Sequence, residues 1–547
     1  RGRRGGRASL MAAEVAGVGG GVKGGVKGGP SRRPYPSGRA MPNCGGAGGT
    51  LPRRNRDDMP FFSDLAQDAR VAAQSLLDYV SGNGLRLGVT GLSRAGKTVF
   101  ITSLVHTLIN ARAGQARLPV FRVHAEGRLK RAFLQPQPDD AVPRFAYEDH
   151  VKALIGEDRR WPESTRRISE LRLTLEFEKP AGWRGGPGEF TIDIVDYPGE
   201  WLLDLGLLGK TYAEWSRETI EASAAAARLP LAQDWRGHLL TLDPAAEADE
   251  NVARASADLF TGYLRAARDD RYALSTLPPG RFLLPGDLEG SPALTFAPLR
   301  MEEGGEIGPG TLAAMMERRY ESYKEKIVRP FFRDHFARLD RQIVLVDALS
   351  ALNSGPAAVR DLETALGDVL TAFRAGRSSL LSTLFRPKID KILFAATKAD
   401  HLHHTSHDRL EAILRLLVKR ASQRAEDLGA QVDVIALAAI RATREAAVKH
   451  DGQTLDAILG TPLKGEIVDG QVFDGIAEAA IFPGELPADP KLVFRGDALA
   501  QKDGESDYRF VRFRPPVPKL SDDGRPLTFP HIRMDRALEF LLGDKLG

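Results

Sequence analysis

The chain has 547 residues and is almost balanced in charge, with 76 basic and 72 acidic side chains. Residues 1–56 hold 12 of the basic side chains and one acidic one, Glu14, which leaves 64 basic and 71 acidic side chains elsewhere. A mildly acidic body excludes a broad nucleic-acid footprint, and we expect no direct nucleic-acid partner. The single cysteine, Cys44, excludes disulfides and a cysteine-based metal site or nucleophile in the core.

No apolar run approaches the length of a membrane span, so no transmembrane segment is expected. We expect a cytoplasmic protein, peripheral at the inner membrane only through a partner. Residues 1–58 are rich in Gly, Arg and Pro without periodicity, which predicts a disordered tail. Two interpretations of the tail stay open: a Gly-Arg arm that binds RNA, and translated upstream sequence, since later methionines offer other starts. Apolar residues at helical spacing then predict a packing helix at 61–80.

Residues 91–98, Gly-Leu-Ser-Arg-Ala-Gly-Lys-Thr, follow an apolar strand pattern at 85–90 and precede a helical pattern at 99–110. They match G-x-x-x-x-G-K-[ST], the phosphate-binding loop, in which backbone N–H groups converge on the phosphates. Lys97 is expected to reach the outer phosphates, and the Thr98 hydroxyl to ligate Mg²⁺. The residues expected to bind the nucleotide here are Gly91, Ser93, Arg94, Ala95, Gly96, Lys97, Thr98 and Val99.

Two strands are expected next, at 168–177 and 190–195, with a hairpin loop in the Gly-rich residues 182–188. The second strand ends in Asp196-Tyr-Pro-Gly199, a D-x-x-G sequence. In nucleotide switches Asp196 would hold Mg²⁺ through water, and the Gly199 N–H would turn to the third phosphate. Thr165, just before the first strand, is the expected switch threonine and Mg²⁺ ligand, with Ser164 as the alternative.

Glu200 stands where many small GTPases carry a water-orienting Gln. A carboxylate beside the third phosphate repels it unless the carboxylate is protonated or turned away. Glu200 is therefore a candidate catalytic residue, with a structural role beside Trp201 as the alternative, and intrinsic hydrolysis should be slow. Arg94 is a possible source of compensating charge, against the alternative of a solvated loop arginine.

Residues 205–339 separate two strands that would otherwise be neighbours, and their helical patterns at 210–226, 251–268 and 311–336 predict an inserted all-helical domain. The nucleotide domain would then comprise 59–204 and 340–547. Strand patterns at 342–346, 391–396 and 432–437 alternate with helical patterns at 357–373 and 409–428. This alternation predicts an α/β fold with a mostly parallel sheet covered on both faces. Residues 452–515 are expected to be irregular, and a last helix is expected at 534–542.

Thr397-Lys-Ala-Asp400 follows one of these strands and matches [NT]-K-x-D, the guanine-reading motif. The Asp400 carboxylate would accept from N1–H and the exocyclic amine of guanine, and the Lys398 stem would lie along the base. Thr397 replaces the commoner Asn, which would loosen the tie to the phosphate loop. After the next strand, Ala439 and Ile440 are expected to offer a backbone N–H to guanine O6.

Four histidines, His401, His403, His404 and His407, crowd the segment after this motif. Metal binding is one interpretation. No carboxylate or cysteine stands at a defining spacing, so we expect a polar loop leading into a helix near residue 406.

In this order the motifs resemble the translation-factor-like class of P-loop GTPases. Three longer segments are similar to the bacterial YcjX-like family: residues 196–204 (DYPGEWLLD), 440–446 (IRATREA) and 529–545 (FPHIRMDRALEFLLGDK). The resemblance runs from about residue 59 to the C-terminus. It implies a Ras-like P-loop fold with an all-helical insertion, and a cytoplasmic nucleotide hydrolase associated with envelope or phage-shock stress, with a small membrane protein encoded nearby.

The leading hypothesis is a Mg²⁺-dependent switch that binds GTP and GDP and hydrolyses GTP. Its helical insertion would report the nucleotide state to an unknown protein effector. Two alternatives stay open: an ATPase that keeps a degenerate guanine motif, and a nucleotide-bound scaffold that does not hydrolyse.

Overall fold

The computed structural model describes residues 83–547 except for 93, 112–115, 138, 164, 166, 181–184, 270, 302–306, 372–388, 451–452, 496–507 and 521–526. The predicted tail at 1–58 and the helix expected at 61–80 lie outside the described residues, as do Ser93, Ser164 and part of the expected hairpin loop at 182–188.

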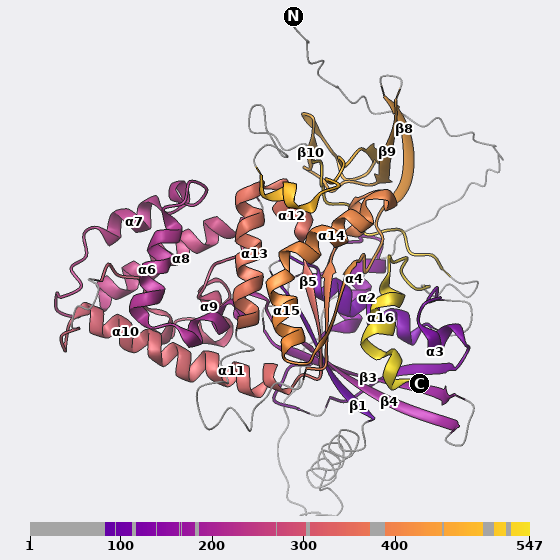
Figure 1. The fold of residues 1–547 in the computed structure, drawn as a ribbon, viewed down its shortest axis with the longest axis horizontal. Helices are drawn as coiled ribbons and strands as arrows, with labels where there is room; N and C mark the ends of the chain where they lie inside the picture. Colours follow the sequence, from indigo (N-terminus) through magenta and orange to yellow (C-terminus); the bar gives the residue numbers. More distant parts are fainter. Residues whose placement is uncertain are drawn as a thin grey trace, which may run out of the picture.

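A seven-stranded sheet with the order β2-β3-β4-β1-β5-β6-β7 forms the centre of the described chain (Figure 1). β1 pairs in parallel with β4 and β5, and β5, β6 and β7 continue in parallel, whereas β2, β3 and β4 pair antiparallel. The strands are β1 (Gly84–Gly91), β2 (Leu129–Gln135), β3 (Ser169–Lys179), β4 (Gly186–Asp196), β5 (Arg341–Val346), β6 (Lys391–Ala396) and β7 (Gln431–Ala436). This mostly parallel sheet confirms the predicted α/β fold class.

Alternate side chains of the central strands enter two different cores. On β5, Ile343 and Leu345 pack with α2 (Lys97–Ile109) and α16 (Met534–Leu542) on one face. Val344 and Val346 pack on the other face, against α13, α14 and α15 (Figure 1). The bounds of these three helices are Pro356–Thr371, His407–Leu417 and Lys419–Asp427. Burial on both faces explains why the β5 sequence is apolar without alternation.

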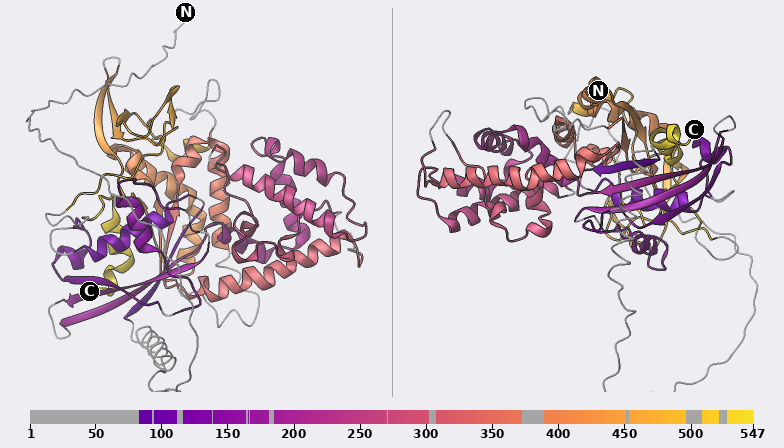
Figure 2. Two further views of the ribbon diagram at one scale, coloured as in Figure 1. Left: turned by 180° about the vertical axis from the view of Figure 1, so that it is seen from behind. Right: turned by 90° about the horizontal axis from the view of Figure 1, so that it is seen from below.

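The chain between β4 and β5 forms a group of helices that project sideways from the sheet (Figure 2). The helices are α5 (Glu200–Leu203), α6 (Tyr212–Ser223), α7 (Gln233–Leu239), α8 (Glu250–Arg268), α9 (Gly280–Leu283), α10 (Leu312–Tyr323) and α11 (Arg329–Asp334). Aromatic rings fill the space between them, with Trp215 stacked on Tyr320 and Trp235 stacked on Tyr263. The same buried apolar cluster continues to Val344 of the sheet, so these helices pack firmly on the rest of the chain.

The prediction that residues 452–515 are irregular is wrong in part, because a small antiparallel sheet forms there. β8 (Arg444–His450), β9 (Gln453–Gly460) and β12 (Ala479–Ile481) pair in the order β12-β9-β8, beside a hairpin of β10 (Ile467–Val468) and β11 (Gln471–Val472). A small core of Ile458, Ile481, Val511 and Phe513 supports them. These strands are short and face water over much of their length, so their sequences carry little apolar alternation.

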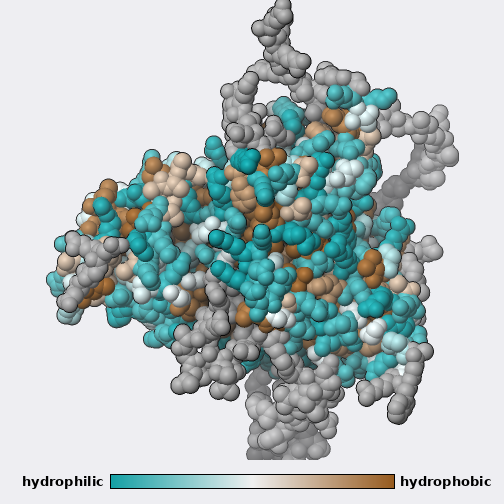
Figure 3. Space-filling view, viewed as in Figure 1, coloured by the Kyte–Doolittle hydropathy of each residue, from teal (hydrophilic) through white to brown (hydrophobic). Residues whose placement is uncertain are grey.

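The structure also adds elements that the sequence analysis did not predict: the edge strand β2 and the helices α3 (Arg122–Ala125), α4 (Tyr147–Ile155) and α12 (Ala348–Asn353). β2 buries one residue, Ala132, which is why its pattern is weak. Among the described residues no helix has the length and apolar character of a membrane span. The face seen in Figure 3 is mainly hydrophilic, with scattered apolar residues.

Candidate nucleotide-binding site

The phosphate-loop sequence connects the end of β1 to the start of α2, as its strand-loop-helix pattern predicts. Gly96 precedes the helix with a φ of 82°, a left-handed conformation that glycine adopts without strain. The Lys97 ammonium donates to the Gly91 carbonyl at 3.1 Å, so the lysine folds back across its own loop. The N–H groups in the first turn of α2 have no acceptor within the helix and face the loop, where a bound anion would accept hydrogen bonds from them.

Three of the residues predicted to bind Mg²⁺ meet beside this loop, although they come from three separate segments. The hydroxyl oxygens of Thr98 and Thr165 are 3.2 Å apart, and the Thr165 hydroxyl donates to Asp196 Oδ2 at 2.5 Å. Asp196 is only 1% exposed, and its other oxygen, Oδ1, is buried without a hydrogen-bond partner among the described residues. Burial raises the pKa of Asp196 to about 6, against the opposing effects of Lys97 and the Thr165 hydrogen bond.

This oxygen set fits a hard divalent cation. Mg²⁺ prefers carboxylate and hydroxyl oxygens, and a bound cation would satisfy the orphaned Oδ1 of Asp196 and favour its ionised form. The Mg²⁺ fit therefore depends on Thr98, Thr165 and Asp196.

Gly199 of the D-x-x-G motif lies directly against the phosphate loop. A Cβ atom at this position would be 1.7 Å from the carbonyl oxygen of Gly91, so the two backbones touch. Gly199 has an ordinary helical φ of −64°, which means that the close approach, and not the backbone conformation, requires glycine. The Gly199 backbone therefore leaves no room for a side chain beside the loop.

Glu200, which follows Gly199, points toward the helical insertion. Its carboxylate accepts from the guanidinium of Arg268 at 2.5 Å, and the side chains of Arg268 and Glu200 are 23% and 6% exposed. Of the two roles expected for Glu200, this geometry matches a side chain turned away from the phosphates. Sequence reasoning missed Arg268, because an arginine at the end of an amphipathic helix carries no signal for a partner 68 residues away.

Residues 200–204, which follow the D-x-x-G motif, also contact the helices between β4 and β5. Asp204 accepts from the Gly280 N–H at 2.6 Å and from the Tyr323 hydroxyl at 2.6 Å, and burial raises its pKa to about 6. A Cβ on Gly280 would lie 1.9 Å from the Glu200 carbonyl, so the backbones are in contact there too. Trp201 packs under the guanidinium of Arg281, with 3.2 Å between the guanidinium carbon and the ring centroid.

A cavity of about 1190 Å³ lies between the switch region and the insertion. Thr165, Trp201, Arg268 and Arg281 are among the residues that line it. Partial burial lowers the pKa of Arg94 in the phosphate loop, and the positive charge of Arg268 acts in the same direction.

The guanine motif follows β6, which lies two strands from β1 along the same edge of the sheet. Asp400 is buried; its Oδ2 accepts from the Ala442 N–H at 2.8 Å, and its carbonyl accepts from the Thr443 hydroxyl. Lys398 has a left-handed φ of 60°, and its ammonium pairs with Asp347 Oδ2 at 2.5 Å. Asp347, which the sequence left unassigned, also caps α12 through the Ser350 N–H.

Thr397, Ala439 and Ile440, which were also predicted to contact the base or its loop, lie next to these residues. The Thr397 hydroxyl donates to the Val346 carbonyl at 3.4 Å. The Ala439 carbonyl accepts from the Ser103 hydroxyl of α2 at 2.6 Å, which fastens the loop after β7 to the helix that begins at the phosphate loop. The Ile440 side chain is buried with Leu154. Ala442 and Thr443, which contact Asp400, were not predicted.

The phosphate loop, the D-x-x-G segment and the guanine motif therefore lie along the carboxyl edge of the parallel sheet, where α/β proteins bind ligands. Comparison with known proteins gives the same direction. A sequence profile described as the YcjX-like family (DUF463) matches residues 85–546. The chain belongs to the YcjX-like family.

Two relatives in this family align over most of their length. A protein of Escherichia coli K12 described as Ras-like GTPase YcjX is 41% identical over 471 residues, which cover 84% of this chain and 96% of the relative. A protein of Shewanella oneidensis with the same description is 36% identical over 492 residues, covering 87% of this chain and 97% of the relative. Family membership and the α/β sheet thus agree with the motifs.

Proposed function

We propose that this protein is a Mg²⁺-dependent GTPase that binds GTP and GDP. The observation that carries the proposal is the meeting of Thr98, Thr165 and Asp196 beside Lys97, with an orphaned buried carboxylate oxygen among them. The description of two full-length relatives as Ras-like GTPases supports the same reading. Mg²⁺ held by Thr98, Thr165 and Asp196 would neutralise charge on the outer phosphates.

The protein's own groups position the nucleotide. Lys97 would exchange the Gly91 carbonyl for the outer phosphates, and the α2 N-terminus would donate backbone N–H groups to them. Asp400, Lys398 and Thr397 would read the base, with Ala439 and Ile440 at its O6 edge. Glu200 is held by Arg268, so it does not orient a water in this arrangement, and we infer slow intrinsic hydrolysis.

We also propose that residues 205–339 report the nucleotide state to an effector. Gly199 touches the phosphate loop, and Glu200 and Asp204 contact Arg268, Gly280 and Tyr323 of the insertion. A movement of Gly199 toward a third phosphate would therefore pull on the insertion directly. From the family resemblance we propose a cytoplasmic protein with a role in envelope or phage-shock stress and a membrane-associated partner.

The test of base recognition is Asp400→Asn, with Asp408→Asn as the control, because Asp408 is 89% exposed. An amide facing guanine N1–H mismatches the base, whereas it can donate to the extra oxygen of xanthine. We expect the variant to lose GTP affinity at least tenfold, equivalent to about 1.4 kcal/mol, and to gain relative preference for xanthosine triphosphate. Competition among GTP, xanthosine triphosphate and ATP measures this.

An unchanged preference for GTP in folded Asp400→Asn protein would refute the assignment of Asp400. Wild-type binding of ATP in preference to GTP would instead favour the ATPase alternative. The Glu200–Arg268 pair favours the scaffold alternative, because it holds the Glu200 carboxylate away from the phosphates, where it does not orient a water. Single-turnover GTP hydrolysis with and without cell extract separates it from a slow GTPase, since a scaffold would release no phosphate in either case.

A further inference from the structure

Two histidines that follow the guanine motif meet a carboxylate from the small antiparallel sheet. His404 Nδ1 lies 3.0 Å from Glu445 Oε2 of β8, and His403 Nε2 lies 3.9 Å from the same oxygen. One ligand atom of each of the three residues falls within 4.8 Å of the other two. The sequence lacked a carboxylate at a metal-binding spacing, but β8 supplies one through the fold.

These separations suit a tetrahedral transition-metal ion. With bonds of about 2.0–2.1 Å, two ligand atoms of tetrahedral zinc are roughly 3.4 Å apart. The 3.0 and 3.9 Å distances to Glu445 Oε2 bracket that value, and the ligand atoms of the two histidines lie within 4.8 Å of each other, so side-chain rotations would bring the three atoms around one ion. Two imidazoles also favour zinc-class ions over Mg²⁺ and Ca²⁺, which prefer oxygen ligands alone.

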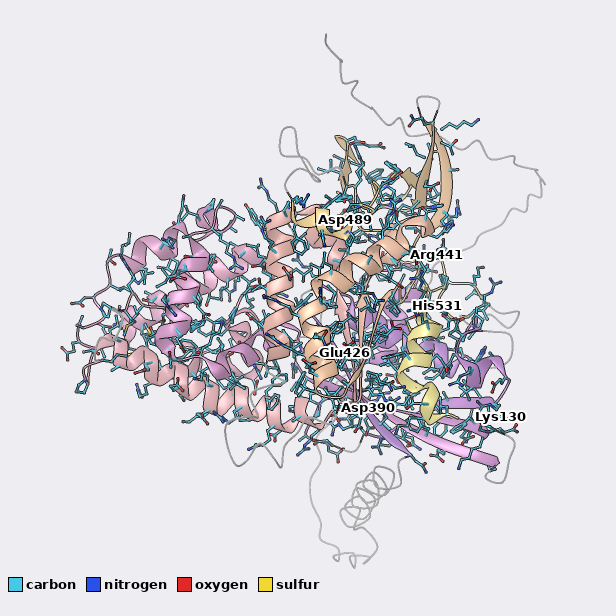
Figure 4. The ribbon with its side chains drawn as sticks, in the orientation of Figure 1. Lys130, Asp390, Glu426, Arg441, Asp489 and His531 are labelled. Carbon is cyan, nitrogen blue, oxygen red and sulfur yellow. The ribbon has the colours of Figure 1, made fainter. Side chains whose placement is uncertain are left out.

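The surroundings orient the ligands as in metal sites. The far nitrogen of His403, Nδ1, lies 3.0 Å from the Thr405 hydroxyl and 3.4 Å from Asp456 Oδ2, so oxygens can hold its proton and leave Nε2 for a metal. The other Glu445 oxygen lies 3.3 Å from the guanidinium of Arg441. Figure 4 labels Arg441 near the base of the β8–β9 ribbon.

We propose that His403, His404 and Glu445 bind one zinc-class divalent ion, with Asp456 orienting His403. Two histidines and one glutamate leave a fourth position for water or another ligand. The side chains of His403 and His404 are 14% and 63% exposed, so one histidine is fixed in the structure while the other lies open to incoming metal.

The bound ion would join the two segments that hold Asp400. His403 and His404 follow Asp400 in the chain. Glu445 follows Ala442 and Thr443, and these two residues hydrogen-bond to Asp400. The metal would therefore cross-link the guanine loop to β8 and slow nucleotide release. This consequence rests on the proposed function, whereas metal binding does not.

Metal binding is tested on the full chain in a Cys44→Ser background, so that the lone thiol cannot contribute. Protein with excess GDP and Mg²⁺ is titrated with Zn²⁺ by calorimetry, and with Co²⁺ by its visible absorption. We expect one site, weakened at least tenfold by His404→Gln or Glu445→Gln. Asp456→Asn should cost about 10- to 100-fold in affinity. Glu478→Gln is the matched control, since Glu478 directly precedes β12 of the same small sheet and its side chain is 51% exposed.

Absence of saturable binding, or binding unaffected by both His404→Gln and Glu445→Gln, would overturn the metal site. His404 is exposed, so its substitution should leave the fold intact and the result interpretable. The release rate of a fluorescent GDP analogue then tests the coupling: Zn²⁺ should slow release in wild type and not in His404→Gln. Equal rates despite bound Zn²⁺ would overturn the coupling alone, and failure to bind guanine nucleotide with an intact Zn²⁺ site would overturn only the proposed function.

Discussion

The ion pair between Glu200 and Arg268 joins residues 200–204 to the helices between β4 and β5. Arg268→Ala should leave the Glu200 carboxylate without this cationic partner. Breaking a buried ion pair from one side costs about 3–5 kcal/mol of unfolding free energy. Glu200 is 6% exposed but Arg268 is 23% exposed, so water can reach part of the gap. We therefore expect a loss of about 2–3 kcal/mol. In the double variant with Glu200→Gln the charge is gone, and most of that loss should be recovered.

Urea unfolding of the four proteins measures this coupling. GDP and Mg²⁺ are held constant, because ligands that bind the folded state shift its apparent stability. Arg265→Ala is the matched control, since Arg265 lines the same cavity one turn earlier on α8 and should change stability by no more than about 0.5 kcal/mol. Effects of Glu200→Gln and Arg268→Ala that add within about 0.5 kcal/mol would refute the buried pair.

The same variant tests communication with the nucleotide. Hydrogen exchange across residues 205–339 should differ between GDP and a non-hydrolysable GTP analogue in wild type, and the difference should shrink in Arg268→Ala. Identical wild-type profiles would leave the insertion as a static platform.

Two further predictions concern the same segment. Because burial raises the pKa of Asp204 from 3.8 to about 6, the stability that this group contributes is fully present below pH 3.8 and is lost as pH rises through about 6. At about 1.4 kcal/mol for each pKa unit, the ionised carboxylate costs about 3 kcal/mol, so the stability gap between wild type and Asp204→Asn should change by about 2 kcal/mol between pH ~4.5 and pH ~8 in urea unfolding; a constant gap would contradict the raised pKa. Gly199→Ala places a Cβ 1.7 Å from the Gly91 carbonyl, so the backbones must separate. GTP-analogue affinity, measured by calorimetry, should fall at least tenfold and GDP affinity less; equal losses would speak against a role of Gly199 in sensing the third phosphate.

Elements that carry their signal locally were predictable. Residues 391–396 and 534–542 form a strand and a helix with the predicted bounds, because a run that is apolar after its first residue, Lys391, and a strong helical stripe each identify their element without reference to the rest of the chain. The phosphate loop was predictable for the same reason, since its chemistry requires a contiguous turn at the start of a helix. Thr165 was predicted from its place in the chain order, and the structure sets its hydroxyl beside the Thr98 hydroxyl and the Asp196 carboxylate.

The sequence by itself thus determined the motifs, the strand–helix alternation and the family resemblance. Tertiary structure alone decided which distant residues meet: Glu200 with Arg268, Asp204 with Tyr323, and His404 with Glu445. Tertiary structure also decided where the half-exposed strands β2 and β8 to β12 form, because their sequences carry little apolar alternation. The physical reason is that a salt bridge or an edge strand depends on what packs beside it, and packing brings together side chains whose separation along the chain carries no chemical signal.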